Sequence, residues 1–300
     1  MLYRKLTDSQ VRARFRELLA GRSLVRLPGV PSPLAARLVE RHGFEGAYVS
    51  GAAVAADLGL PDVGLTTLSE VATRCRQIAR MTDLPVIADA DTGFGEVLNV
   101  ARAVQELEDA GLAGIHIEDQ MSPKRCGHLD GKAVVDDATA AQRVKAAVSG
   151  RRDPNFVLIA RTDLRAVGGL DAAIGRARLL ADAGADVIFP EALRTLDEFE
   201  RMCSAVQAPV LANMTEFGKS ELFTASELHA VGVRLVIWPV SLLRLAMGAA
   251  DRALATLSSE GTFASLTAQM QHRSDLYELV DYGGYSQLDS SVFDFSIDRL

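Results

Sequence analysis

Acidic side chains follow short apolar runs in the sequence, at a spacing that suits a metal ion. In "PVIADADTGFG", Asp89 and Asp91 are two residues apart, so both point the same way from the end of an extended strand. Glu118 ends the next such run, "GIHIED". A few carboxylate oxygens that leave room for water and substrate suit Mg²⁺ better than zinc, and histidine is too sparse to indicate otherwise. These residues therefore predict a magnesium site.

Other residues at the ends of apolar runs could hold an organic acid beside this metal. Arg161, in "FVLIARTD", can bind a carboxylate through two parallel hydrogen bonds. "SGA" at 50–52 offers a turn whose backbone N–H groups can bind an anion. Any one polar residue in such a place could instead be a helix cap or a solvated loop residue. Taken together, they predict a small polycarboxylate ligand chelated to Mg²⁺.

One of the three cysteines lies in a basic, glycine-rich segment, "SPKRCGHLDGK". Positive charge from Lys124, Arg125 and His128 would favour the thiolate of Cys126, and Gly127 would let the loop move. This pattern predicts a catalytic acid or base on a lid, although an incidental loop cysteine is the simpler alternative.

The other two cysteines, Cys75 and Cys203, lie in helical patterns and are expected to be small, partly buried apolar residues. The three are far apart in sequence and form no CxxC pair, so neither disulfides nor a zinc cluster are supported.

Eight short β-rich runs alternate with amphipathic stretches. The runs are "LVRLPG", "GAYVSG", "PVIADAD", "GIHIED", "FVLIARTD", "DVIFPEA", "PVLANMT" and "RLVIWPV". Stretches such as "SPLAARLVERHG", "LNVARAVQELEDAG" and "LDAAIGRARLLADAG" each end at a glycine that suits a helix C-terminus. Such a repeat predicts one (β/α)₈ barrel, in which all strand ends meet at a single mouth. A doubly wound open sheet is the alternative, but its GxGxxG turn is absent.

Residues 1–300 are expected to form a single barrel domain, with a helical N-terminal lead and a helical C-terminal extension from about Gly261. The 48% hydrophobic and 24% charged residues are typical of a globular protein. A net charge of −7 provides no basic surface for nucleic acid or a membrane, and neither a long apolar span nor a signal peptide is visible. We therefore expect a cytoplasmic protein that binds neither nucleic acid nor a membrane.

The motifs together resemble those of the isocitrate lyase/phosphoenolpyruvate mutase superfamily. The similarity rests on "DADTGFG", "IEDQ", "KRCGH", "ARTD", "FPEA" and "LANMTEFG", in this order, and extends from about Gly29 to "MQHRSDLYELVDYGGY". Within the superfamily the chain most resembles the 2-methylisocitrate lyases. The resemblance implies a barrel whose last helix is exchanged between subunits, a homotetramer, and Mg²⁺-dependent cleavage of this tricarboxylate to pyruvate and succinate in propionate catabolism, the methylcitrate cycle.

The resemblance also implies catalytic roles. Asp89 and Asp91 would be the metal carboxylates, and Glu118 would hold metal-bound water. Arg161 would neutralise the substrate oxygen and carboxylate beside the metal, and Tyr48 would remove the hydroxyl proton of the substrate. Cys126 would then protonate the succinate carbanion from the opposite side.

The implied substrate-binding residues form three groups. The pyruvate carboxylate would be bound by Ser50, Gly51 and Ala52. The succinate half would be positioned by Glu191, Asn213, Thr215 and Arg244. The extra methyl group would lie among Phe189, Ile237 and Pro239, while Gly127 and His128 of "KRCGH" would also contact substrate.

Two departures leave the substrate open. The chain has "SGA" where methylisocitrate lyases often have "SGG", and the "HLDGK" after Cys126 also suits alkylmalate lyases and phosphonomutases. The alternatives are therefore another 2-alkylmalate or oxaloacetate lyase, or a carboxyphosphonoenolpyruvate mutase. A catalytically silent, metabolite-binding barrel is a third reading, which the presence of the thiol and the metal acids disfavours.

Overall fold

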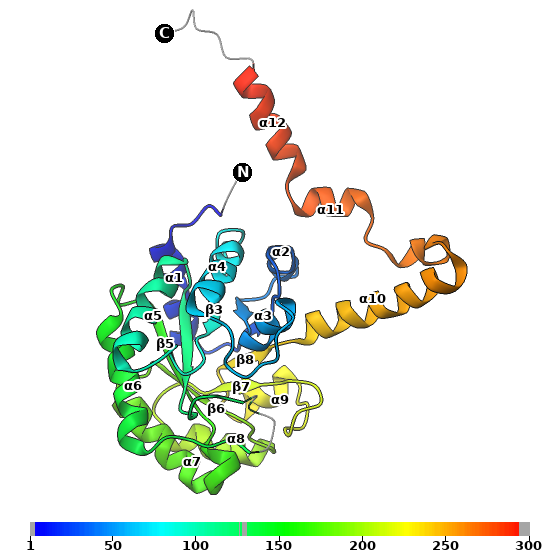
Figure 1. Cartoon of the computed structure of the whole chain (residues 1–300). Helices are drawn as coiled ribbons and strands as arrows, with labels where there is room; N and C mark the ends of the chain where they lie inside the picture. The colour runs from blue at the N-terminus through cyan, green and yellow to red at the C-terminus, as the bar shows by residue number, and fades with distance from the viewer. Residues whose placement is uncertain (1–3, 126, 128–130, 294–300) are drawn as a thin grey trace, which may run out of the picture.

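The computed structural model describes residues 4–125, 127 and 131–293, and a closed barrel of parallel strands lies at its centre (Figure 1). Each of the eight apolar runs forms one strand within these residues. The strands are β1 (Val25–Pro28), β2 (Ala47–Val49), β3 (Val86–Asp89), β4 (Gly114–Glu118), β5 (Val157–Thr162), β6 (Val187–Pro190), β7 (Leu211–Asn213) and β8 (Leu235–Trp238). The (β/α)₈ barrel is thus confirmed, and the open-sheet alternative is wrong.

The barrel closes at two seams between a five-stranded and a three-stranded sheet. The sheets have the strand orders β2-β3-β4-β5-β6 and β1-β8-β7. Isolated parallel bridges from Gly29 to Tyr48 and from Ile188 to Val210 join them. All of the pairings are parallel, so the C-terminal ends of the strands meet at one mouth.

Helices connect the strands and cover the outside of the barrel (Figure 1). Their bounds are α1 (Asp8–Ala20), α2 (Pro33–Arg41), α3 (Gly51–Asp57), α4 (Leu68–Ala79), α5 (Val97–Asp109), α6 (Asp137–Gly150), α7 (Leu164–Asp182), α8 (Leu196–Ala205), α9 (Ala225–Ala230) and α10 (Ser241–Glu260). Three connections turn at Gly43, Gly111 and Gly184, with φ of 72°, 85° and 109°. These left-handed values confirm the prediction that glycines terminate α2, α5 and α7.

Alternate residues of each strand fill the barrel interior. Ile87, Ile159 and Leu211 point inward and belong to a fully enclosed cluster with Phe15 of the N-terminal helix α1. Their neighbours along the strands, such as Leu158, pack against the helices instead. Burying one such side chain contributes roughly 1.5–3 kcal/mol. The last inward-facing residue of each strand is then left at the mouth, where it can serve a site rather than the core.

The helix after β5 begins earlier than the sequence pattern indicates. The pattern starts at Leu170, whereas α7 starts at Leu164 and bends at Gly169, where φ is 84° and ψ is 179°. Its N-cap residue, Asp163, makes no side-chain capping bond, because its carboxylate is bound elsewhere.

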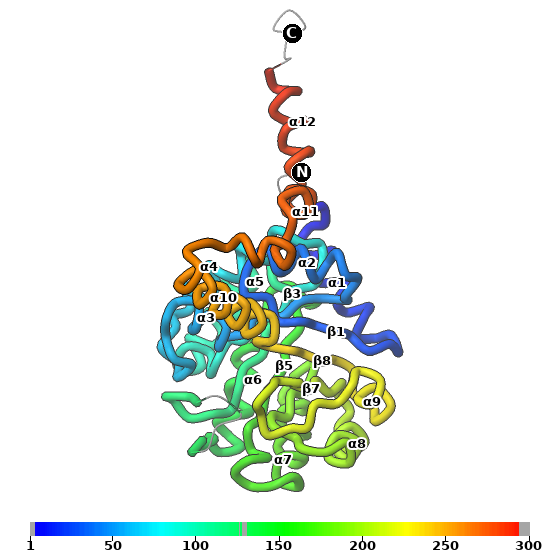
Figure 2. Tube along the Cα trace, turned by 90° about the vertical axis from the view of Figure 1, so that its right-hand side faces the viewer, coloured from blue at the N-terminus to red at the C-terminus, as the bar shows by residue number. Residues whose placement is uncertain are grey.

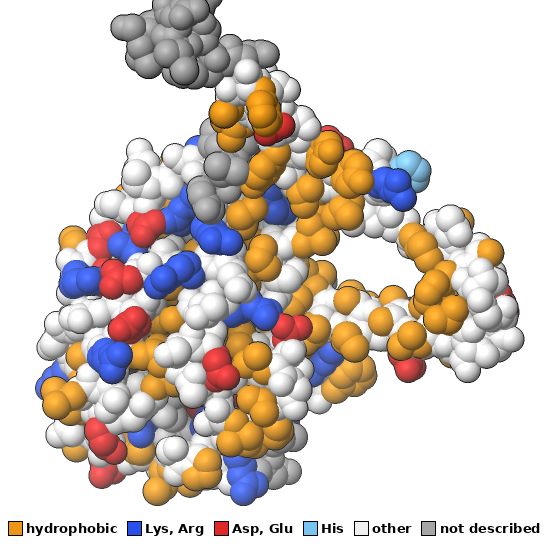
Figure 3. Space-filling model, turned by 45° about the horizontal axis from the view of Figure 1, so that its top comes forward, with side chains coloured by type: hydrophobic (Ala, Val, Ile, Leu, Met, Phe, Trp, Pro, Cys, Tyr) orange, Lys and Arg blue, Asp and Glu red, His pale blue; other side chains and the backbone are white. Residues whose placement is uncertain are grey.

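The chain ends in a helical arm that extends away from the barrel (Figure 2). After α10 come a 3₁₀ turn (Ala264–Gln269), α11 (Arg273–Leu279) and α12 (Tyr282–Phe293). No residue of α10 or α12 is buried, and hydrophobic side chains such as Leu245, Leu254 and Phe293 are exposed (Figure 3). None of the helices in the described part of the chain is long and apolar enough to cross a bilayer.

Candidate active site

A cavity of about 200 Å³ lies at the mouth of the barrel, where the strand ends deliver polar side chains. Most of the predicted site residues line it: Tyr48, Ser50, Ala52, Asp89, Gly127, Arg161, Phe189, Glu191, Asn213, Thr215, Pro239 and Arg244. They come from strands of both sheets and from the connections that follow them. Sequence segments up to about 200 residues apart therefore converge on one small volume.

Some of the predicted site residues do not line this cavity. Gly51 and Glu118 are buried beside it, and Asp91 faces a second cavity. Ile237 is 0% exposed and packs inside the barrel with Tyr48, so it does not line the cavity as the methyl-pocket prediction requires.

Asp89 and Asp91 lie at the end of β3 and have opposite electrostatic environments. The Asp91 amide donates to Asp89 Oδ1 at 2.9 Å, and Asp91 adopts the left-handed region with φ of 47°. Burial opposes ionisation of Asp89, but His116, Lys124 and Arg161 lower its pKa to about 2. Burial and the charge of Asp89 instead raise the pKa of Asp91 to about 6. The pair thus concentrates negative charge at one point.

The beginning of α3 is pressed against this pair. A Cβ on Gly51 would lie 2.7 Å from Asp89 Oδ2, so only glycine allows this approach. Ser50 is the N-cap of α3, without a side-chain capping bond. The N–H groups of the first turn have no intrahelical acceptor. This geometry supports the expectation that residues 50–52 can bind an anion.

Glu118 is a buried carboxylate with unused hydrogen-bonding capacity. Neither of its side-chain oxygens accepts a hydrogen bond among the described residues, although Arg161 Nη1 forms an ion pair with Oε2 at 3.2 Å. Burial, only partly offset by Arg161, raises the pKa of Glu118 well above its usual range. Buried polar oxygens normally have partners, so these are suited to metal-bound water.

The oxygen donors fit a hydrated magnesium ion. In the described part of the chain, no three His, Cys, Asp or Glu side chains are grouped as a direct metal site. Mg²⁺ is usually bound by one or two carboxylates and retains several waters. Asp89 and Asp91 as ligands, with Glu118 beyond a water, agree with that preference.

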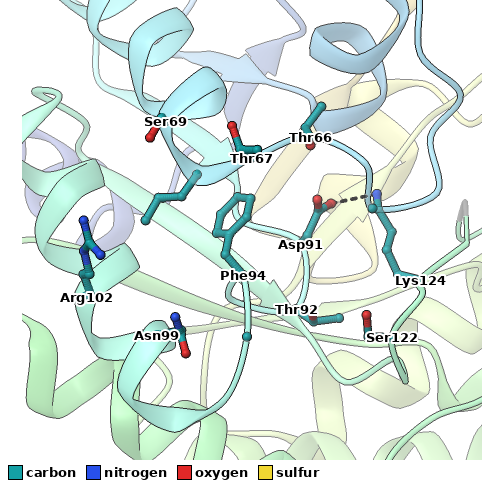
Figure 4. Close-up of a pocket in the computed structure, with 13 residues that line it drawn as sticks. Thr66, Thr67, Ser69, Asp91, Thr92, Phe94, Asn99, Arg102, Ser122 and Lys124 are labelled. Atoms are coloured by element: carbon teal, nitrogen blue, oxygen red, sulfur yellow. Dashed lines mark ion pairs between the residues drawn. The ribbon is translucent and has the colours of Figure 1, made fainter.

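Lys124 lines both the cavity at the mouth and a second cavity of about 510 Å³ (Figure 4). Its ammonium lies 2.7 Å from Asp91 Oδ1 and 2.5 Å from Asp62 Oδ1. Burial alone would lower the pKa of Lys124, but the surrounding carboxylates raise it overall. Hydroxyl groups from Thr66, Thr92 and other residues line the second cavity together with Asp91.

Arg161 lies among carboxylates at the end of β5. Its guanidinium donates to Asp163 from Nε at 3.0 Å and from Nη2 at 3.2 Å. Glu191 Oε2 lies 3.6 Å from Nε. Burial opposes this charge, yet Asp163, Glu118 and Glu191 hold the pKa of Arg161 well above its usual value. Arg161 therefore remains a fixed cation in the cavity wall.

Tyr48 is held from below by a buried histidine. Its hydroxyl lies 2.8 Å from His116 Nε2, and the two rings stack with centroids 5.7 Å apart. Burial, with a contribution from the Asp89 charge, raises the pKa of Tyr48 well above its usual value. Burial lowers the pKa of His116 to about 4. A neutral imidazole that accepts from the phenol carries its proton on Nδ1, 3.6 Å from Asp89 Oδ1.

The neutral His116 makes folding stability depend on pH. Its folded pKa of about 4 is below the ordinary 6.5, so the unfolded chain binds more protons between these values. We expect this group to lower the free energy of unfolding by up to about 1.4 kcal/mol per pH unit as pH falls from 6.5 toward 4. Urea unfolding of the wild type and His116→Gln at several pH values measures the difference in slope. Identical slopes would contradict the assignment.

The wall of the cavity also carries the residues predicted to hold the succinate half. Asn213 Nδ2 donates to both carboxylate oxygens of Glu191 at 3.3 Å. Arg244, near the start of α10, donates to the Thr215 hydroxyl at 3.3 Å and to Glu216 at 3.0 Å. This wall offers charged and amide donors for a second carboxylated arm.

Lys124, Arg125 and Gly127, from the connection after β4, line the cavity. The Gln120 side chain forms two hydrogen bonds with the backbone of Arg125. Its Oε1 accepts from the Arg125 amide at 2.9 Å, and its Nε2 donates to the Arg125 carbonyl at 2.8 Å. Gln120 also forms an antiparallel bridge with Val134. Gly127 lines the cavity, whereas the predicted residues Cys126 and His128 lie outside the described residues.

Four residues to which sequence reasoning assigned no role complete the site: Asp62, His116, Asp163 and Lys132. His116 had a signal in the sequence, since it is polar at an inward-facing position of β4 between Ile115 and Ile117. Asp163 is the last residue of the motif "ARTD" and lies at the end of the same apolar run as Arg161. Nothing in the sequence alone shows that Asp62 or Lys132 would reach the site.

A compact acid cluster and a fixed guanidinium at the mouth of a closed (β/α)₈ barrel define an enzyme that acts on small anionic molecules. The chain belongs to the phosphoenolpyruvate phosphomutase family, whose model matches residues 15–258.

This chain is similar to several known proteins. It is 57% identical over 293 residues to the probable 2-methylisocitrate lyase 2 of Corynebacterium glutamicum, covering 98% of this chain and 95% of the relative. A solved oxaloacetate acetylhydrolase in complex with 3,3-difluorooxalacetate is 34% identical, with a TM-score of 0.90 and coverage of 97% and 99%. A phosphonopyruvate hydrolase in complex with oxalate and Mg²⁺ is 27% identical, with a TM-score of 0.84 and the same coverage.

Proposed function

We propose that this protein is a Mg²⁺-dependent carbon–carbon lyase that cleaves 2-methylisocitrate to pyruvate and succinate, in the methylcitrate cycle of propionate catabolism. The observation that carries the proposal is the set of polar groups that line one cavity. Asp89 and Arg161 come from β3 and β5, and Asn213 and Arg244 come from β7 and α10. A substrate with carboxylates on both halves fits this arrangement, and the similarity to the Corynebacterium glutamicum relative supports the choice of substrate.

The residues divide the reaction between them. When bound at Asp89 and Asp91, Mg²⁺ would polarise the oxygen that becomes the ketone of pyruvate. Tyr48 takes the hydroxyl proton as a phenolate, a form that burial and the charge of Asp89 oppose and that the charge of Arg161 only partly favours. The carbon–carbon bond then breaks, and its electron pair moves to the succinate carbon beside the carboxylate. Cys126 donates a proton to that carbon.

The rates at which the protein cleaves four candidate substrates test the proposal. We expect 2-methylisocitrate to be cleaved with a kcat/KM about tenfold or more above that for isocitrate, because burying one methyl group in an apolar pocket is worth roughly 1–3 kcal/mol. Phe189 and Pro239 supply apolar surface in the cavity. The measurement is pyruvate release from 2-methylisocitrate, isocitrate, 2,3-dimethylmalate and oxaloacetate with Mg²⁺. Equal values for the first two substrates would refute the methyl pocket.

A phosphonomutase is the second candidate, favoured by the family whose model the chain matches. Glu191, Asn213, Thr215 and Arg244 form a second polar wall that a compact phosphonate does not need. The lyase accounts for this wall, and the mutase does not. Cleavage of oxaloacetate or 2,3-dimethylmalate in place of 2-methylisocitrate would reassign the substrate within the same superfamily.

We also propose a cytoplasmic homotetramer in which the C-terminal arm docks on another subunit. The apolar side chains of α10 and α12 support this assembly, since neither helix buries a residue within its own chain. Residues 1–300 would act as one barrel domain whose extension reaches the neighbouring copy.

A further inference from the structure

Asp163 is a buried carboxylate that binds two cations at once. Its side chain is 0% exposed and accepts from Arg161 Nε at 3.0 Å and from Arg161 Nη2 at 3.2 Å. The Lys132 ammonium donates to its Oδ1 at 2.8 Å. Its own amide donates to Asp119 Oδ1 at 2.9 Å, which fixes the backbone independently of the carboxylate. Asp163 does not line the substrate cavity, so its influence on chemistry is indirect.

Lys132 joins this carboxylate to Gly127, which lines the cavity. Its side chain is 1% exposed, and its ammonium also donates to the carbonyl of Gly127. Two acceptors from different parts of the chain therefore share one buried ammonium. Moving Asp163 would remove the charge that keeps Lys132 in place.

The backbone of Gly127 packs closely against the side chains of Arg161 and Glu191. A Cβ at this position would be 2.3 Å from Arg161 Nη2 and 2.6 Å from Glu191 Cγ, closer than any side chain tolerates. The Gly127 backbone and the Arg161 guanidinium are thus in contact, and Asp163 binds Arg161 directly and Gly127 through Lys132. The contacts therefore form a ring, from Asp163 to Arg161, from Arg161 to Gly127, and back to Asp163 through Lys132.

We propose that Asp163 is a positioning residue, whose single carboxylate orients Arg161 and, through Lys132, holds Gly127 over it. The role rests on the proposed function only in assigning substrate binding to Arg161. Charge-assisted hydrogen bonds between buried groups are the strong ones, and removal of one partner leaves the others desolvated and unpaired. Asp163 therefore couples two features of the site that the sequence places 34 residues apart, at positions 127 and 161.

Two variants and their combination test this coupling. Asp163→Asn keeps the shape and the backbone bond to Asp119 and is expected to lower kcat/KM by about 10²-fold, through loss of charge-assisted bonds to Arg161. Lys132→Met, which leaves the Arg161–Asp163 pair intact, is expected to lower kcat by about tenfold with KM changed less than threefold. In the double variant the loss should match that of Asp163→Asn alone, because Lys132 has already lost its partner.

The control is another arginine–aspartate pair. Asp171 and Arg201 interact at 2.7 Å on the exterior, where their side chains are 89% and 49% exposed. Asp171→Asn removes the same kind of pair far from the cavity and is expected to leave kcat and KM unchanged.

A second readout does not depend on the substrate. Trypsin cleavage after Arg125 should become at least about fivefold faster in Lys132→Met and Asp163→Asn, without a change in the urea midpoint large enough to account for it. Wild-type cleavage rates in both variants, or losses of kcat/KM that multiply in the double variant, would overturn the proposal. If 2-methylisocitrate is not the substrate, the proteolysis result still decides the coupling.

Discussion

Replacement of Asp89 by asparagine is expected to lower kcat/KM by at least about 10³-fold and to weaken Mg²⁺ binding in parallel. The carboxylate, which has a pKa of about 2, is ionised near neutral pH and is a fixed negative charge at the cavity. A metal that stabilises developing oxygen charge is worth several kcal/mol, and about 4 kcal/mol corresponds to 10³ in rate. Calorimetric titration with Mg²⁺ and steady-state kinetics measure the two effects.

The amide of asparagine preserves the shape of this position. Its Oδ1 can still accept the Asp91 amide, so folding should be retained. Asp171→Asn is again the matched control, since it removes an exposed carboxylate at no cost to the site. Full wild-type activity in excess EDTA would exclude the metal role of Asp89 and Asp91.

Cys126→Ser is expected to fold normally, to bind Mg²⁺ and product, and to lose turnover by about 10²–10⁴-fold. A serine hydroxyl is a far weaker acid than a thiol, so it cannot supply the proton that the succinate carbanion needs. This residue lies outside the described residues, and the expectation rests on its basic, glycine-flanked sequence. Single-turnover kinetics with 2-methylisocitrate measure the loss.

The other cysteines provide an internal reference. Burial raises the pKa of both Cys75 and Cys203 to about 12, so neither is a thiolate near neutral pH. Iodoacetamide should therefore modify Cys126 first, and substrate with Mg²⁺ should protect it. A near-normal kcat in Cys126→Ser, or inactivation that follows modification of Cys203, would move the proton donor to another group.

The fold could be predicted because it depends on periodic, local features. Apolar runs of strand length, such as the one that ends at Asp89, and glycines such as Gly111 and Gly184 leave signals within a few residues. The first turns of α7 and the bend at Gly169 were missed because Gly168 and Gly169 precede the pattern that starts at Leu170, and paired glycines are typical of a loop. The surface on which the terminal arm is proposed to dock was likewise not readable, since its apolar side chains do not identify a partner.

The sequence could predict which strand ends supply the site residues, but not the direction in which each side chain points. Strand alternation brings Asp89, Arg161 and Asn213 to one mouth. The left-handed backbone at Asp91 turns its carboxylate toward the second cavity, and no pattern in the sequence encodes that φ. Ile237 was also misplaced, because alternation puts it in the interior cluster but it does not reach the cavity wall, whereas Tyr48 of the same cluster does.

Residues whose roles were not predicted act through contacts with distant parts of the sequence. Asp62 was not predicted at all, and Lys124 was predicted only as a positive charge near the Cys126 thiol. The two form a pair, 62 residues apart. Such a pair depends on how two loops meet above the barrel, and loop conformation is set by tertiary packing rather than by local propensity. His116 shows the converse, since one polar residue in an otherwise apolar interior layer is a visible exception.

The two seams of the barrel have a consequence for how the molecule opens. Each seam is joined by an isolated bridge, whereas neighbouring strands within a sheet pair over at least three residues, so we expect the two sheets to separate at the seams before either sheet unravels. The cavity draws Tyr48 and Arg161 from one unit and Asn213 and Pro239 from the other. A bound ligand therefore ties the units together, and its stabilising effect on amide exchange falls first on the seams.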